Sequence, residues 1–198
     1  MNTQLCICGI EELDYHSARG VTHVLSILDP DWPEPESFWA YEPHHRLTLR
    51  FHDAIEREGD LILPTRDAVK AILNFGALIN CSSAGKENNL LIHCHAGVSR
   101  STAAAAILLA QTNPDCEETQ IFDKLLELRP RAWPNSRMIA FADALLQREG
   151  RLVNALGALY ARQLRRDPQA QHLLNIGGRR REVTMAAAAE QRLLLQEK

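Results

Sequence analysis

The sequence lacks any run of about 18 apolar residues, the length at which an apolar run predicts a membrane-spanning helix. Its first residues also lack the basic and apolar regions of a signal peptide. The five cysteines (residues 6, 8, 81, 94 and 116) are odd in number and irregularly spaced, which argues against a disulfide framework. These absences predict a cytoplasmic protein without stable membrane insertion.

An excess of basic residues is also absent. The 22 lysines and arginines are balanced by 25 aspartates and glutamates, giving a net charge of −3, so nothing in the overall charge favours nucleic-acid binding. The distribution is uneven: residues 1–60 hold 4 basic and 12 acidic residues (4 − 12 = −8), and residues 162–198 hold 8 and 4 (8 − 4 = +4). The basic C-terminal part fits an anionic substrate, an acidic partner or a plain solvated surface.

Metal-ligand patterns are missing too. His93 and His95 could face the same side of an extended segment, but a zinc site needs three or four ligands, and no further Cys or His pair stands at zinc spacing. We therefore expect no metal and no cofactor.

The apolar periodicity predicts an α/β fold. We expect a central sheet of four or five mostly parallel strands with helices on both faces, plus a helical C-terminal extension. The predicted strands are 5–8, 21–28, 46–51 and 90–92, and a polar turn spans 81–89. The predicted helices are 11–18, 65–81, 100–111, a helix that begins at 115 or 117 and ends at 128, 136–148, 150–164 and 183–196. We divide the chain into a catalytic domain (1–165) and a basic linker with a C-terminal helical tail (166–198), which is expected to dock on the body or on a partner.

Residues 93–102, HCHAGVSRST, lie between an apolar strand and a strongly helix-forming run. A loop that closes onto a helix N-terminus aims free backbone N–H groups inward, and the helix dipole adds positive charge, so an anion site is predicted. Gly97 permits a left-handed backbone, and Arg100 offers a planar cation that can hold two phosphate oxygens. The same surroundings favour a thiolate, so Cys94 is predicted to be a nucleophile.

The spacing of Cys94, five residues, Arg100 and Ser101 resembles the signature of cysteine-dependent phosphatases, and HCHAGVSRS is especially similar to dual-specificity and related tyrosine phosphatases. The general layout is also similar to a bacterial tyrosine-phosphatase-like group. The resemblance implies phosphomonoester hydrolysis through a phosphocysteine intermediate. In it His93 orders the loop, Ser101 assists departure of the thiolate, and the phosphate is held by the loop residues His95, Ala96, Gly97, Val98 and Ser99.

Such a phosphatase needs a proton donor, because phenolate and alkoxide are poor leaving groups. Asp53 is the leading candidate. It follows a predicted strand, as the acid does in dual-specificity phosphatases, although its 41-residue distance from Cys94 (94 − 53) is somewhat longer than usual there. Glu56, Asp60 and Asp31 remain open as alternatives.

Two further segments bear on the site. Pro134-Asn135 is a helix-start signal, and in the phosphatase resemblance Asn135 caps that helix and supports the phosphate loop. Three prolines at 30–35 predict a rigid loop, in which Trp32 either packs on the body or lines the entrance.

Substrate class is suggested by the absence of lysine at the five loop positions. Phosphatases of inositol phospholipids often carry lysine there, so a phosphorylated protein is favoured, with phosphotyrosine ahead of phosphoserine and phosphothreonine. Two other functions stay open. One is a phosphate-binding module without catalysis, and the other is a rhodanese-like sulfurtransferase, whose loop typically holds one residue fewer.

Overall fold

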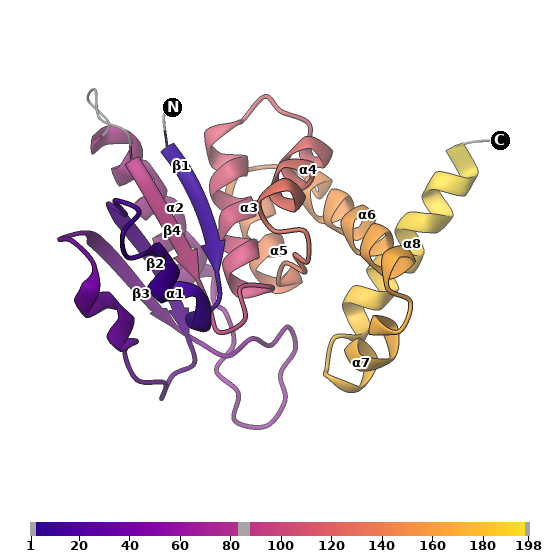
Figure 1. Ribbon diagram of the computed structural model, residues 1–198. Helices are drawn as coiled ribbons and strands as arrows, with labels where there is room; N and C mark the ends of the chain where they lie inside the picture. Colours follow the sequence, from indigo (N-terminus) through magenta and orange to yellow (C-terminus); the bar gives the residue numbers. More distant parts are fainter. Residues whose placement is uncertain (1–2, 83–87, 197–198) are drawn as a thin grey trace.

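The computed structural model describes residues 3–82 and 88–196 (Figure 1). The strands β1 (Thr3–Cys8), β2 (His23–Leu28), β3 (His45–Arg50) and β4 (Asn88–His93) form one parallel sheet in the order β1-β4-β2-β3. The predicted α/β fold is confirmed, with four strands. Residues 83–87 of the predicted turn, and the last two residues of the predicted tail, lie outside the described residues.

The helices form unequal layers around this sheet. The α-helices are α1 (Leu13–His16), α2 (Arg66–Ser82), α3 (Arg100–Thr112), α4 (Glu118–Leu128), α5 (Ser136–Leu145), α6 (Arg151–Arg166), α7 (Ala170–Ile176) and α8 (Arg180–Gln196), and two 3₁₀ turns are η1 (Ile10–Glu12) and η2 (Glu36–Ala40). The main core lies between the sheet and α2 to α6, and a smaller core lies under α1 and η2 on the other face. Figure 1 shows α6 to α8 extending away from the sheet.

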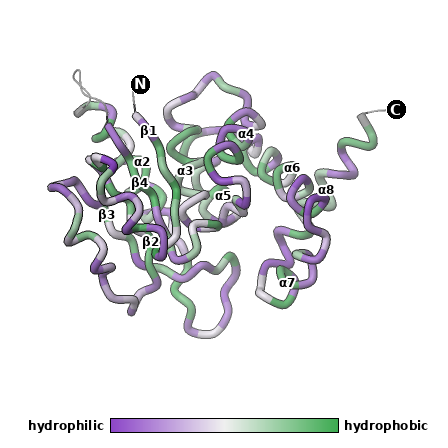
Figure 2. Tube along the Cα trace, in the orientation of Figure 1, coloured by the Kyte–Doolittle hydropathy of each residue, from purple (hydrophilic) through white to green (hydrophobic). Residues whose placement is uncertain are grey.

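Strand alternation explains the two cores. In β2, Leu25 and Ile27 face the main core, while Val24 faces the smaller one. The whole strand is buried, as in a sheet covered on both faces. Four fully buried alanines, Ala103–Ala106, let α3 approach the sheet closely. Figure 2 shows hydrophobic residues concentrated in these central elements.

The helix predicted over residues 136–148 ends earlier, at Leu145. Gln147, Glu149 and Gly150 take left-handed conformations (φ 55°, 53° and 83°) and turn the chain back on itself. The carboxylate of Asp143 then accepts hydrogen bonds from the backbone N–H of Gly150 (2.7 Å) and Leu152 (2.9 Å), which caps the start of α6. Tertiary contacts impose positive φ on these two non-glycine residues, and the local sequence does not predict it.

The four strands end at one edge of the sheet because all are parallel. The residues that follow them, Gly9, Asp29, Phe51 and Cys94, therefore meet at this edge. In parallel α/β sheets this carboxyl edge is where ligands bind.

The C-terminal residues fold back on the body. α8 packs along α6, where a Cβ on Gly157 would lie 3.0 Å from the carbonyl oxygen of Met185. Arg179, expected in a solvated linker, is buried instead, at 9 % exposure. The division at residue 165 stays a prediction. Among the residues that the structure describes, no helix is both long and apolar enough to cross a bilayer.

Candidate active site

The carbonyl groups of the loop between β4 and α3 all have hydrogen-bond partners elsewhere in the protein. All five carbonyls from His95 to Ser99 accept hydrogen bonds from outside the loop. The donors are Ile10 N to His95 O (2.9 Å), Arg129 Nη2 to Ala96 O (3.2 Å), Arg129 Nε to Gly97 O (3.0 Å), Trp133 N to Val98 O (2.8 Å) and Asn135 N to Ser99 O (3.3 Å).

The amides of residues 96–100 consequently point the other way. In a planar trans peptide the N–H is antiparallel to the preceding C=O, so carbonyls that face outward leave these five N–H groups facing the loop centre. None of them donates to another residue within the described part of the chain. Inward amides at the N-terminus of a buried helix form a cradle for an oxyanion.

Close packing fixes the loop against the end of β1. Gly97 has φ +66°, and a Cβ there would lie 2.5 Å from the carbonyl carbon of Cys8 and 2.6 Å from the nitrogen of Gly9. Only glycine fits this position, because both the backbone conformation and the contact exclude a side chain.

Cys94 lies at the base of the cradle, 2 % exposed. Its Sγ is 3.1 Å from Oγ of Ser101, on the first turn of α3. This hydroxyl can donate a hydrogen bond to a thiolate, the role that the family resemblance implies for Ser101.

His93 precedes the cysteine and is fully buried. Its Nε2 lies 2.6 Å from Oγ of Ser26, and that oxygen accepts a hydrogen bond from Nε of Arg46 (3.0 Å). The hydroxyl has one proton and a second lone pair left, so which atom donates in this contact depends on the tautomer of the neutral ring. Burial, aided by the charge of Arg46, lowers the pKa of His93 to about 3.

Arg100 is buried and oriented by two acceptors. Its Nη1 donates to Oδ1 of Asp29 (2.6 Å) and to the carbonyl of Phe51 (2.7 Å), which follow β2 and β3. Its Nε is buried without a hydrogen-bond partner among the described residues. An unpaired buried donor is costly, so this edge of the guanidinium is suited to an incoming anion.

Arg129 supports the loop from behind. Besides its bonds to two loop carbonyls, it forms a bidentate pair with Glu12 (2.8 and 2.7 Å). Hydrogen bonding to Arg129 holds the pKa of Glu12 below its usual range, so the pair is ionised. Glu12 in turn accepts from the N–H of Gly9 (2.6 Å), which ties this support to the end of β1.

Asp53 lines the same cavity as the loop and contacts the loop directly. Its Oδ1 accepts from Oγ of Ser99 (2.8 Å) and Nδ2 of Asn135 (3.0 Å), and it lies 2.5 Å from Nη2 of Arg179. The cavity, of about 350 Å³, is lined by Asp53, Cys94, His95, Ala96, Val98, Ser99, Arg100, Trp133, Leu174 and Arg179. Of the four carboxyl groups considered as the acid, Asp53 alone is among these residues.

Asn135 caps α5 as predicted, since its side chain accepts from the N–H of Met138 (3.2 Å). The proline-containing loop brings Trp32 against His95, with ring centroids 4.4 Å apart. Nε2 of His95 accepts the N–H of Asp29 (3.1 Å), and burial lowers the pKa of this histidine. Trp32, 44 % exposed, therefore borders the loop at its solvent side.

Among the residues of the site that the sequence did not predict are Asp29, Arg129 and Arg179. Asp29 directly precedes the predicted proline-rich loop, and Arg129 follows the predicted helix that ends at residue 128. Arg179 comes from the tail, 80 residues after Ser99, to which it donates (2.8 Å). Only tertiary folding reveals these partners.

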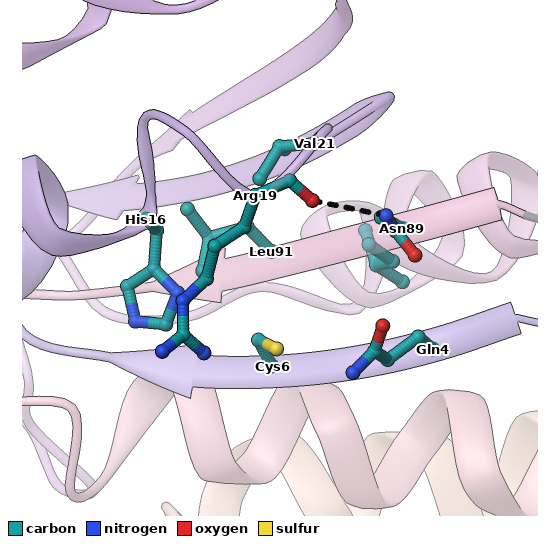
Figure 3. Close-up of a pocket in the computed structure, with 8 residues that line it drawn as sticks. Gln4, Cys6, His16, Arg19, Val21, Asn89 and Leu91 are labelled. Atoms are coloured by element: carbon teal, nitrogen blue, oxygen red, sulfur yellow. Dashed lines mark hydrogen bonds between the residues drawn. The ribbon is translucent and has the colours of Figure 1, made fainter.

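A second depression, of about 300 Å³, lies over β1 and β4 and contains none of the predicted site residues. Figure 3 shows its polar lining, in which the amide of Asn89 donates to the carbonyl of Arg19 (3.1 Å) beside Gln4, Cys6 and His16. It is separate from the cavity at Cys94.

We compared the sequence and the structure with known proteins. No protein-family model and no curated protein sequence matches the chain. Among solved structures, PTP-2 phosphatase of Cydia pomonella matches with TM-score 0.55 and 20 % identity, covering 71 % of this chain and 84 % of that one. Human DUSP28 matches with TM-score 0.53 and 19 % identity over 71 % and 89 %.

Human tyrosine phosphatase-like serine/threonine/tyrosine-interacting protein matches with TM-score 0.55 and 16 % identity, over 75 % of this chain and 99 % of that one. The predicted resemblance is thus confirmed at the level of the fold. The chain has the fold of the cysteine-dependent protein tyrosine phosphatases, of the dual-specificity type.

Proposed function

We propose that this protein is a cysteine-dependent phosphatase that hydrolyses phosphotyrosine in proteins through a phosphocysteine intermediate. The observation that carries the proposal is the cradle itself. Five inward amides and the unpaired Nε of Arg100 surround the space next to Sγ of Cys94. Such donors match the three equatorial oxygens of a phosphoryl group in the transition state.

In the first step, thiolate Cys94 attacks phosphorus in line with the leaving oxygen. The S–P bond forms while the P–O bond breaks, and Asp53 gives its proton to the departing oxygen. In the second step, the Asp53 carboxylate takes a proton from water, which attacks phosphorus. The S–P bond then breaks, and Ser101, 3.1 Å from Sγ, donates a hydrogen bond to the departing thiolate.

The walls of the cavity support an aryl phosphate. Trp133 and Leu174 provide apolar surface beside the catalytic groups, and no lysine projects from the loop. A phosphotyrosine ring can pack on such surface, whereas phosphoserine offers little to bury. The same assay can compare the rate of hydrolysis of phosphotyrosine peptides with the rates for phosphoserine and phosphothreonine peptides.

The test is hydrolysis of a phosphotyrosine peptide in the presence of a metal chelator. We expect turnover by the wild type, none by Cys94→Ser, and about 100-fold or more loss in Asp53→Asn, the usual size of a general-acid effect. Two controls should keep wild-type rates: Cys81→Ser, because Cys81 is exposed, and Glu56→Gln, because Glu56 does not line the cavity.

Failure would take a specific form. A wild type that binds vanadate or phosphopeptide without turnover is a phosphate-binding module, and transfer of sulfur from thiosulfate to cyanide without phosphatase activity indicates a sulfurtransferase. Either result contradicts the proposal.

A further inference from the structure

The guanidinium of Arg179 joins the C-terminal tail to the candidate acid. Its Nη2 lies 2.5 Å from Oδ1 of Asp53 and donates to Oγ of Ser99 (2.8 Å), while Nη1 lies 3.1 Å from both oxygens of Glu182. Burial lowers the pKa of Arg179, but the two carboxylates outweigh it and leave the pKa above its ordinary value. One cation from the tail thus lies between two carboxylates.

Glu182 fixes this cation to the body of the protein. The residue is fully buried, and its oxygens accept from Nε1 of Trp133 (2.5 Å) and from the N–H of Ser136 (2.9 Å), with the Tyr160 hydroxyl 3.1 Å away. The N–H of Ser136 belongs to the first turn of α5, where the helix dipole favours a carboxylate. Arg179 is therefore held from the side opposite Asp53.

Only one of the two carboxyl oxygens of Asp53, Oδ1, has hydrogen-bond partners within the described part of the chain. Ser99, Asn135 and Arg179 all approach Oδ1, whereas Oδ2 has no hydrogen-bond partner among residues 3–82 and 88–196. Three donors on one oxygen fix the rotation of the carboxyl group and leave the other oxygen to carry a proton. Arg179 and Glu182 are buried charges, whose burial is costly, so an arrangement that pairs them at the cavity wall beside the more exposed Asp53 indicates a function beyond stability.

We propose that Arg179 is a positioning residue, supplied by the tail, that orients the carboxyl group of Asp53 for proton transfer to the leaving group. This inference rests on the proposed function, and it extends the active site to the residue that directly precedes α8. It predicts that Arg179 matters most where the leaving oxygen needs a proton. Phenyl phosphate needs one, whereas 4-nitrophenyl phosphate releases a much weaker base and needs it far less.

The test compares both substrates in Arg179→Met, which keeps an unbranched side chain up to about the Nε position but removes the charged guanidinium group. We expect kcat for phenyl phosphate to fall about 10- to 100-fold, with a small change for 4-nitrophenyl phosphate and little change in KM. Arg181→Met is the matched control, because Arg181 lies two residues further along, in the first turn of α8, is exposed and should leave both rates unchanged.

A double variant makes the test specific. If Arg179 acts through Asp53, Asp53→Asn with Arg179→Met is no slower on phenyl phosphate than Asp53→Asn alone. Arg179→Lys restores the charge and should recover part of the lost rate. If Arg179→Met fails to fold by circular dichroism, the same substrate comparison on Arg179→Lys decides, with a smaller but still selective loss expected.

Several outcomes would overturn the inference. Equal loss on both substrates indicates a merely structural role, unchanged rates indicate no role, and a faster variant indicates an inhibitory contact. These outcomes leave the proposed function intact, whereas inactivity of the wild type on both substrates would remove the proposed function and this inference with it.

Discussion

At the scale of single residues, His93 shows how the site controls charge. A protonated imidazole directly before Cys94 would lie buried near Arg46 and Arg100, so the fold keeps the ring neutral. The hydroxyl of Ser26 gives Nε2 of the buried neutral ring a hydrogen-bond partner. A buried neutral histidine costs stability once the unfolded chain can take up a proton.

This linkage predicts a pH dependence. The folded pKa of His93, about 3, is below the unfolded value of 6.5. At pH values between these two pKa values, His93 is therefore protonated in the unfolded chain and neutral in the native protein. The free energy of unfolding should fall on acidification by up to about 1.4 kcal/mol per pH unit in this window, and should not respond above it.

Urea unfolding of the wild type and His93→Gln from pH 7.5 to pH 4 measures the effect. The variant should lose less stability on acidification, so the difference between the two proteins changes with pH. A difference that stays constant over this range would mean that His93 takes up a proton in the native state.

At the scale of elements, the phosphate loop was predictable because its signals are local. The strand, the loop and the helix lie within about twenty consecutive residues, and Pro134-Asn135 likewise predicts the start of α5 from local sequence. The partners of the loop were not predictable. Asp29 and Arg129 reach it through the parallel sheet and the return of the chain after α4, which no periodicity encodes.

The tight contact between this loop and β1 makes a second prediction. Gly97→Ala should reduce kcat/KM by about 100-fold or more and destabilise the fold, because a Cβ would strike backbone atoms at 2.5 to 2.7 Å and displace the amides. Gly59→Ala is the control. It shares a positive φ (+53°) but meets nothing within 4 Å, so it should cost about 1 kcal/mol of stability and no activity.

Steady-state kinetics and thermal unfolding of the two variants separate conformational strain from steric contact. Equal effects of both substitutions on activity would contradict the packing argument for Gly97.

At the scale of the whole molecule, the tail and the sheet form one unit. α8 packs on α6, its Ala186 joins the main core, and Glu182 bonds to α5. The sequence predicted a basic linker followed by a helical tail that docks on the body or on a partner, and only the packing shows Arg179 inside the cavity wall.

A larger side chain between α6 and α8 should therefore affect catalysis in the active site. In Gly157→Val the new side chain meets Met185 and Ala189, which should push α8 from α6, lower the thermal midpoint and slow phenyl phosphate hydrolysis more than 4-nitrophenyl phosphate hydrolysis. Asn154→Val, at an exposed position of the same helix that borders a groove to α8, introduces the same β-branched side chain without adding a Cβ between the helices. If Asn154→Val also slowed phenyl phosphate hydrolysis more than 4-nitrophenyl phosphate hydrolysis, coupling through the interface between α6 and α8 would be refuted.

The central claim is that Cys94 becomes covalently phosphorylated. In Ser101→Ala the thiolate loses its hydrogen-bond donor at 3.1 Å, so breakdown of the intermediate should slow and the phosphoenzyme should accumulate. We would mix this variant with a phosphotyrosine peptide, quench with acid and identify the modified peptide by mass spectrometry. The account predicts one added phosphoryl group on the Cys94 peptide, absent from Cys94→Ser; peptide hydrolysis without any such adduct would contradict it.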